Sequence, residues 1–337
     1  MKEFTITKND AGQRLDRWLA KTLPVLPAPL AQKYLRLKRV KRNGRPARRD
    51  ERLEQGDVLQ IYINDEFFET PSRENAFLSV FKPQLDIVYE DDNLLLLNKR
   101  PGMVVHPDDK ERVNTLLTHL QAYLYQKKEW SPYWEHSFAP ALCNRIDRNT
   151  GGIVIAAKNA ETLRVMNQKI RDREIKKNYL CIIHGTIEPP AGALNGFLLK
   201  DEEKAQVKVF HRPVPGGRTA VTRYRTLAVR DGLSLLECEL VTGRTHQIRA
   251  QFADAGHPLL GDGKYGTERD GKRYGRGYQA LYSYRLEFRF TTDAGPLNAL
   301  NGRVWTVEDV DFVAEYFPGY RAGDGPAAGR GDCGGTG

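Results

Sequence analysis

The sequence has no hydrophobic run long enough to cross a lipid bilayer. The longest stretches without a polar side chain, such as Gly151–Ala157, are far shorter than the roughly 20 apolar residues that a membrane helix needs. No apolar stretch follows a basic start at the N-terminus, so no secretory signal is predicted. We therefore expect a cytoplasmic protein without a membrane partner.

Residues typical of metal and cofactor sites are also scarce or badly spaced. The four cysteines form no C-x-x-C pair, which argues against a disulfide framework and a cysteine-rich zinc site, and no H-E-x-x-H is present. The G-x-G-x-x-G match at Gly261–Gly266 neither follows a clear strand nor opens a long apolar helix. No serine lies in a G-x-S-x-G turn. The sequence thus predicts no metal and no cofactor.

Positive charge is abundant and concentrated. The chain of 337 residues carries a net charge of +9, and nearly all of this excess lies between Ala31 and Asp50. A concentrated basic stretch is typical of a polyanion-binding surface, although a solvated face without special role is the alternative. The candidate residues of this stretch for binding a polyanion are Lys33, Arg36, Lys38, Arg39, Lys41, Arg42 and Arg45.

The length suggests about two domains. In residues 1–65, apolar spacing predicts helices near 14–20 and 30–37, Asn43-Gly44 predicts a turn, and 58–63 reads as a strand. This pattern predicts a small N-terminal α/β-type domain. Residues 66–84 contain two prolines and no steady period, and are expected to be a linker.

The sequence predicts a larger second domain over residues 85–320. Strands are expected at 87–98, on either side of a turn, and at 152–157, with helices at 115–125 and 160–171. Beyond Asn178 we expect short strands up to about Leu240. This mixture indicates an α+β class with a mixed, mainly antiparallel sheet flanked by helices and loops. The Gly- and Ala-rich segment 321–337 is expected to be a disordered tail.

Three polar segments interrupt the predicted core strands. The first, 144–152, places Asp147 between Arg145 and Arg148, where nearby positive charge would keep the carboxylate ionised. Such an acid suits a nucleophile, or simply the cap of a turn. In the second, Tyr179 starts an apolar strand and is a core aromatic or a proton carrier. The third, 240–252, holds Arg244 and Arg249, which suit an anion site or a helix start.

The order of these segments resembles the RluA family of RNA pseudouridine synthases. The family's H-R-L-D-x-x-T-S-G is matched by 144–152, its K-x-Y by Lys177-Asn-Tyr179, its T-G-R-T-H-Q-I-R by 242–249, and its G-H-P-I-x-G-D by 256–262. Residues 98–102 and 104–107 also look like the family. The resemblance covers about 85–317. Two departures stand out, because Asn144 replaces the usual His and Gly151 the usual Ser.

The N-terminal domain resembles the S4-type RNA-binding domain. The matching features are Arg14-Leu-Asp-Arg-Trp-Leu, the basic stretch that ends at Gly44, and 53–58. It departs from the family at Pro27 and Pro29, where Ser and Arg are frequent, and at Lys38, where Gly is frequent.

The resemblance implies an enzyme that converts uridine to pseudouridine in structured RNA after flipping the base out of its stack. It implies that Asp147 is the essential carboxylate and that Arg244 pairs with it. Tyr179 would pack on the uracil and be a candidate proton acceptor, and Arg145 would fill the space left by the flipped nucleotide. We expect large-subunit ribosomal RNA as substrate, transfer RNA as second candidate, and a monomer.

Two other functions stay open at this point. A non-catalytic RNA-binding protein could carry the same basic domain with a degenerate synthase domain. A glycosidase would need a second acid close to Asp147 in space. Conversion of uridine to pseudouridine in an RNA substrate separates all three.

Overall fold

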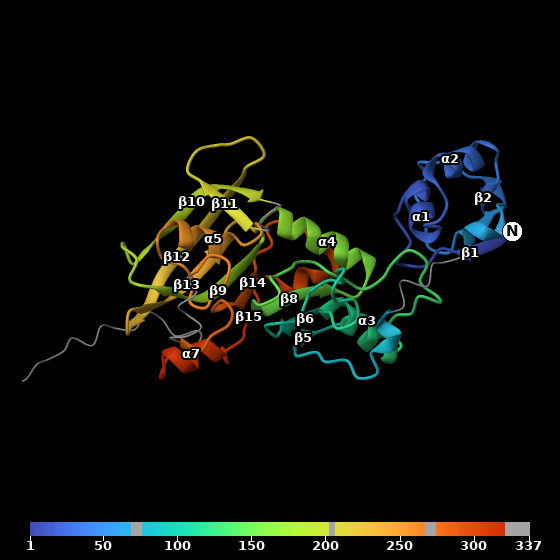
Figure 1. Ribbon diagram of the computed structural model, residues 1–337. Coiled ribbons are helices and arrows are strands. Elements are labelled where there is room, and N and C mark those ends of the chain that lie inside the picture. The colour runs from blue at the N-terminus through green and yellow to red at the C-terminus, as the bar shows by residue number, and fades with distance from the viewer. Residues whose placement is uncertain (69–75, 202–205, 267–273, 321–337) are drawn as a thin grey trace, which may run out of the picture.

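A computed structural model describes residues 1–68, 76–201, 206–266 and 274–320 of the chain. The molecule is elongated, with a small N-terminal domain at one end and a large sheet domain beside it (Figure 1). The predicted tail 321–337 lies outside the described residues.

The N-terminal domain is a four-stranded antiparallel sheet with two helices. Its strands have the order β1-β4-β2-β3. Trp18 and Leu19 on one helix and Tyr34 and Leu35 on the other are buried against the sheet. The architecture is consistent with the expected S4-type domain. The elements are β1 (Lys2–Thr5), α1 (Leu15–Thr22), α2 (Ala28–Arg36), β2 (Val40–Arg42), β3 (Arg45–Pro46) and β4 (Val58–Ile61).

The Asn43-Gly44 turn is confirmed as the connection between β2 and β3. Both residues have positive φ, 51° and 78°, which is the conformation that a two-residue hairpin favours and Asn and Gly tolerate best. The Asn43 side chain holds the turn in place, because its Oδ1 accepts the N–H of Val58 at 2.8 Å and its Nδ2 donates to Asp57 at 2.7 Å.

Residues 66–84 are partly built into the two domains. Short helical turns cover η1 (Asp65–Phe68) and η3 (Ala76–Ser79). Phe67 and Phe68 pack against the core of the N-terminal domain, whereas Phe77 and Val80 are buried in the core of the large domain. The chain between these two anchored ends, 69–75, lies outside the described residues.

The large domain is built on one long mixed sheet. Its described strands have the order β11-β10-β12-β13-β9-β14-β8-β6-β5, with β15 on β14 and β7 on β8. All pairs are antiparallel except β14 with β8. The α+β class is therefore confirmed. The strands are β5 (Ile87–Glu90), β6 (Leu94–Lys99), β7 (Ala141–Leu142), β8 (Gly151–Ala157), β9 (Ile175–His184), β10 (Ala191–Asp201), β11 (Gln206–Phe210), β12 (Arg218–Arg230), β13 (Leu233–Leu240), β14 (Leu281–Phe288) and β15 (Val304–Thr306).

The expectation of short strands beyond Asn178 was wrong. β9, β10 and β12 span 10, 11 and 13 residues. Polar and charged residues on their exposed faces interrupt the apolar pattern and make long strands look like several short ones. Two helices lie close to the expected ranges, α3 (Leu116–Gln126) and α4 (Ala160–Arg171), and α5 (Gln247–Asp254) lies where a helix start was one reading of 240–252. The helix α7 (Asp311–Tyr316) and the 3-10 helix η4 (Gly295–Leu300) were not predicted.

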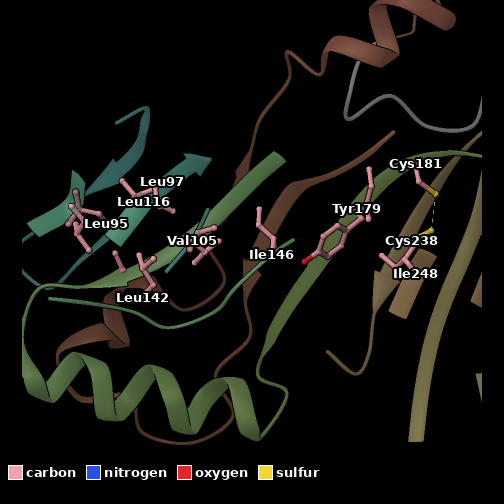
Figure 2. Packing of buried hydrophobic residues seen from close by; sticks show 14 of the residues in the cluster. Leu95, Leu97, Val105, Leu116, Leu142, Ile146, Tyr179, Cys181, Cys238 and Ile248 are labelled. Atoms are coloured by element: carbon pink, nitrogen blue, oxygen red, sulfur yellow. Dashed lines mark hydrogen bonds between the residues drawn. The ribbon is translucent and has the colours of Figure 1, made fainter. Parts of the chain in front are cut away.

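The main core joins the two halves of this sheet (Figure 2). Leu95, Leu97 and Leu142 belong to the half around β6 and β8, and Cys181, Cys238 and Ile248 to the half around β9 and β13. Ile146 and Tyr179 lie between these two groups, with the Tyr179 hydroxyl directed toward Ile146. The segment that carries Asp147 is therefore fixed by a buried neighbour, Ile146, at the junction of the sheet.

The N-terminal domain is docked on the large domain through the loop 131–138. Asn9 Nδ2 donates to Glu135 at 2.6 Å, and its Oδ1 accepts the N–H of Ala160 at 3.0 Å at the start of α4. The His136 ring contacts Phe4 edge-on, with ring centres 5.3 Å apart. These are specific side-chain contacts, so the docking is more than a flexible tether. No described helix is long and apolar enough to span a membrane.

Candidate active site

A pocket of about 680 Å³ opens where the halves of the large sheet meet. Its walls combine the loop 143–147, the start of β9, the end of β13 and the loop into α5. The three polar segments that the sequence singled out therefore converge on one cavity. Its volume is in the range that protein pockets use for small molecules and single nucleotides.

Asp147 lies in the loop between β7 and β8. The Thr150 N–H donates to its carbonyl at 3.1 Å, so the residues after it form a tight turn before β8 begins. Its side chain is 27% exposed and reaches the pocket. Oδ2 accepts a hydrogen bond from Arg249 Nη1 at 2.9 Å, and His246 Nε2 lies 3.8 Å away. The carboxylate is thus held by Arg249 and His246 on one side and open to the cavity on the other.

Arg249 is held in turn by Asp262. Its Nε and Nη2 donate to the two carboxylate oxygens of Asp262 at 2.7 and 2.8 Å, a two-pronged geometry that fixes the guanidinium plane. Asp262 is 1% exposed and also accepts the N–H groups of Lys264 and Tyr265. Burial acts to raise the pKa of Asp262, but Arg249 and these N–H groups outweigh it and lower the pKa. Asp262 therefore remains an anion and orients Arg249 toward Asp147.

The expected pairing of Arg244 with Asp147 requires a correction. In the described structure Arg249 makes that ion pair, whereas Arg244 Nε donates to the carbonyl of Thr219 at 3.1 Å. The two arginines lie in one motif, so spacing alone did not separate them. Arg249 lies in the first turn of α5 and is buried, whereas Arg244 precedes the helix in a loop.

His246, directly before α5, has an unusual backbone. Its φ of 53° is in the left-handed region, where a residue with a Cβ is uncommon. Its Nδ1 lies 3.0 Å from the Tyr265 hydroxyl, and burial lowers its pKa while Asp147 opposes that effect. The ring therefore stays near Asp147 as a mainly neutral neighbour, and Arg249 provides the positive charge.

Tyr179 lies in β9 on the wall of the pocket, and it is 5% exposed. Burial raises its pKa to about 12, although a hydrogen bond with Ser283 opposes the change. The phenol is therefore protonated near neutral pH. It offers the cavity an aromatic ring and a hydroxyl, and it is poorly suited to accept a proton in its resting form.

The two departures from the family motif have structural partners. The Asn144 Oδ1 accepts the N–H of Ile155 at 2.8 Å and so ties the motif to β8. At Gly151 a Cβ would lie 2.3 Å from Cε2 of Tyr282 on the neighbouring strand. The Tyr282 ring occupies the space that a serine side chain would need, and its hydroxyl donates to Asn98 at 2.6 Å.

Lys99 holds the loop that contains Asp147 in place. The sequence did not single it out as a site residue. Lys99 is 1% exposed, and its ammonium donates to the carbonyls of Arg100, Met103 and Arg148 at 2.8–3.0 Å. Burial lowers its pKa to about 7. The lysine therefore joins the residues after β6 to the residue that follows Asp147.

The predicted RNA-binding residues lie on two separate surfaces. Arg145 lines the pocket. The basic stretch runs from the end of α2 through β2 and β3, where Lys33, Arg36, Lys38, Arg39 and Arg45 are exposed. Lys41 lies over the Tyr62 ring, and Arg42 is engaged by Asp57 at 2.6 Å. Arg42 is thus used within the domain.

Asp262 and Lys99 were missed as site residues, and Arg249 was noted without a role. Arg249 and Asp262 were visible as polar residues within apolar segments, at 248–252 and 258–262. Such residues are good candidates for buried, paired charges. Among the described residues there is no group of three His, Cys, Asp or Glu side chains arranged to hold a metal ion.

Comparison with known proteins gives concordant matches. Residues 93–254 match the family model described as RNA pseudouridylate synthase. The chain is 32% identical over 293 residues to ribosomal large subunit pseudouridine synthase C of Vibrio cholerae, covering 86% of this chain and 88% of the relative. It is 30% identical to an RNA pseudouridine synthase of Mycoplasma genitalium, covering 85% and 88%. It is also 30% identical to ribosomal large subunit pseudouridine synthase D of Neisseria meningitidis, covering 85% and 74%.

The fold has relatives among solved structures. Human RNA pseudouridylate synthase domain containing 4 aligns with a TM-score of 0.53 at 22% identity, over 67% of this chain and 89% of that chain. This likeness concerns the fold alone and extends the agreement from sequence to architecture.

Proposed function

The chain belongs to the RluA family of RNA pseudouridine synthases, and from this premise we propose that it modifies large-subunit ribosomal RNA by an Asp147-dependent reaction on a flipped uridine. Two of the relatives named above act, by their names, on the large ribosomal subunit. The observation that carries the reaction is the position of Asp147 at the pocket wall, ion-paired with Arg249.

The overall reaction is an isomerisation within one nucleotide. The bond between N1 of uracil and C1′ of ribose breaks, and a bond between C5 and C1′ forms. The hydrogen on C5 leaves as a proton to solvent, and N1 gains one. The reaction needs no electron acceptor, and no group leaves the nucleotide. A carboxylate, an aromatic side chain and a cavity that retains the base can therefore carry it out.

In this proposal each pocket residue has a distinct task. Asp147 is the carboxylate on which the reaction depends, and Arg249, held by Asp262, keeps it in place. Tyr179 packs on the uracil and keeps the detached base in the cavity. Arg145, which lines the pocket, fills the space that the nucleotide leaves in the RNA. Flipping costs a few kcal/mol, which contacts to the RNA backbone must offset.

The alternative functions are less consistent with this site. A glycosidase needs a second acid that can donate a proton to a sugar. The acid that shares Arg249 with Asp147 is Asp262, which is fully buried and bound on both oxygens. The other acid that lines the pocket, Glu239, is ion-paired with Lys176 and Arg223. For a non-catalytic RNA-binding protein, a cavity with a partly exposed, ion-paired Asp147 has no evident use.

The proposal is tested by replacing Asp147. Asp147→Asn keeps the shape and removes the charge, so pseudouridine formation should fall to background. RNA affinity should stay within about tenfold, or roughly 1.4 kcal/mol. Activity is followed as tritium released from C5-labelled uridine in unmodified large-subunit ribosomal RNA transcripts. The matched control is the exposed Asp109→Asn, which should behave as wild type.

The substrate is tested by mapping pseudouridine in total RNA from cells with and without the gene. A site in the large ribosomal RNA that disappears with the gene supports the assignment. Loss confined to transfer RNA contradicts it, and ready turnover by folded Asp147→Asn contradicts the mechanism.

A further inference from the structure

Lys177 lies in the pocket wall two residues before Tyr179. Both residues are in β9, and since side chains alternate along a strand they lie on the same face. The Lys177 Nζ is 3.9 Å from the position that a Cβ on Gly243 would occupy, at the start of the loop into α5. The amine is thus placed between two of the segments that build the active site.

Several other charged groups of this pocket are paired, whereas Arg145, Arg171 and Arg173 are exposed and form no ion pair with a described residue. Arg249 has Asp147 and Asp262, Lys176 has Glu239 at 3.3 Å, and Arg289 has Glu287 at 2.7 Å. The Lys177 amine forms no hydrogen bond or ion pair with any described residue, although the side chain is only partly exposed. Burial lowers the pKa of its amine. A polar group held in this way without a partner costs stability, and proteins retain such groups mainly at functional sites.

We propose that Lys177 binds a backbone phosphate adjoining the flipped uridine, an inference that rests on the proposed function. Uracil and ribose are neutral, so the phosphate is the anion that such a nucleotide brings to the cavity. An ammonium supplies three donors and a full charge, which suits a phosphate oxygen. Gly243 has no side chain there, which leaves the amine accessible from the loop side.

Arg173 is a second cation of the pocket wall, and it lies at the exposed rim of the pocket. It follows α4, lines the same pocket, is exposed, and forms no ion pair with a described residue. Arg173, just before β9, and Lys177, within it, are therefore two cations without an ion pair that line the same cavity. The phosphate next along the RNA chain is the group that Arg173 would meet.

The experiment compares full-length Lys177→Met and Lys177→Arg with wild type. Met keeps the length and apolar stem and removes the charge, and the exposed Lys82→Met is the matched control. Affinity is measured against salt in the inactive Asp147→Asn background, with an RNA stem–loop carrying the uridine found by mapping. A second set of stem–loops carries a neutral methylphosphonate on the 5′ or the 3′ side of that uridine.

Lys177→Met should weaken binding about tenfold, as expected when one charge-assisted hydrogen bond is removed, and lower the salt slope by about 0.7–0.9. It should raise KM more than it lowers kcat, and Lys177→Arg should restore part of the affinity. One methylphosphonate should abolish the difference between wild type and Lys177→Met. Thermal stability should be unchanged or increased, because an unpaired buried amine is removed.

Three results would overturn the proposal. These are an unchanged salt slope, a loss of kcat at constant KM, or a lower melting temperature that shows a structural role. If wild type forms no pseudouridine, the proposed function fails separately. Single-stranded poly(U) RNA then replaces the stem–loop, and an unchanged salt slope for Lys177→Met would overturn the phosphate contact.

Discussion

Arg249 holds two carboxylates at once, and they have different tasks. Asp262 is buried and bound on both oxygens, while Asp147 is partly exposed and bound on one. The buried acid fixes the guanidinium, so the arginine can neither rotate away from Asp147 nor screen it from the cavity. In the proposed reaction, Asp262 therefore acts through Arg249, as a positioning residue.

Asp262→Asn should lower kcat at least tenfold with little effect on RNA affinity. The amide cannot accept both arms of the guanidinium, so Arg249 loses its fixed orientation. Breaking a buried ion pair should also reduce the free energy of unfolding by about 3–5 kcal/mol. The measurements are turnover, RNA binding and chemical unfolding.

A buried ion pair outside the pocket serves as the control for Asp262→Asn. Lys169 and Glu174 are 2.7 Å apart and almost fully buried. Glu174→Gln should reduce stability in the same way and leave kcat near that of wild type at a temperature where both variants are folded. Equal kcat losses in both variants would mean that Asp262 affects only stability.

Among the secondary-structure elements, β8 and β14 form the parallel pair of the described sheet. This pairing fixes the start of β8 and therefore the turn before it, which carries Asp147. Tyr282 is opposite Gly151 and Ser283 opposite Gly152. Gly152 has φ of 116°, and a Cβ there would lie 2.2 Å from the Ser283 carbonyl oxygen. The two strands therefore approach closely only because both residues are glycine.

Gly151→Ser should reduce the free energy of unfolding by about 1–3 kcal/mol, because its Cβ would overlap the Tyr282 ring. In a Tyr282→Ala background the same change should cost much less. Chemical unfolding of wild type, the two single variants and the double variant measures the coupling energy between Gly151→Ser and Tyr282→Ala. Gly277→Ser, at a site with open space and no positive φ, is the control. Additive effects would show that the ring is not the obstacle.

Across the whole molecule, the proposed function divides RNA binding and chemistry between two domains that are in contact. The basic stretch lies on the N-terminal domain and the pocket in the large domain. Asn9 bonds both Glu135 and the first turn of α4, so docking fixes the position of one domain on the other. Under the proposed function, the fixed docking would hold RNA bound to the basic stretch at a set distance from the pocket.

Removal of residues 1–68 should weaken binding to structured RNA and make its salt dependence shallower. The slope should fall by about 0.7–0.9 for each RNA phosphate that the truncated protein no longer binds. The cut falls after Phe68 because Phe77 and Val80 belong to the core of the large domain. Uridine isomerisation should persist at high enzyme concentration. The measurements are affinity against salt, turnover and circular dichroism.

A full-length variant with Arg36, Arg39 and Arg45 replaced by Gln separates charge from docking. It should reproduce the weaker binding, since these side chains are exposed and leave the domain contacts intact. Unchanged slopes in both proteins would place the RNA elsewhere. Loss of all turnover in a folded truncated protein would mean that the two domains form one active unit.

Several elements and the family could be predicted from the amino-acid sequence alone. Alternation and helical spacing placed α3, α4, β6 and β8 within a few residues, because each of these elements buries a regular apolar face. The three polar segments were recognisable for the same reason, since polar residues within apolar strands require an explanation. Their resemblance, in the same order, to the motifs of the RluA family indicated RNA pseudouridine synthesis.

The ion-pair partners in the pocket became known only from the three-dimensional structure. Arg244 and Arg249 are both arginines of the same sequence motif, so the motif does not show which of them pairs with Asp147. Because α5 begins between them, Arg249 lies in the helix and is buried beside Asp147, whereas Arg244 stays in the loop. Asp262 approaches from 13 residues further along, and Tyr282 reaches Gly151 across the sheet. Such contacts join residues distant in the chain. Their partners are set by how strands and helices pack, which local spacing does not encode.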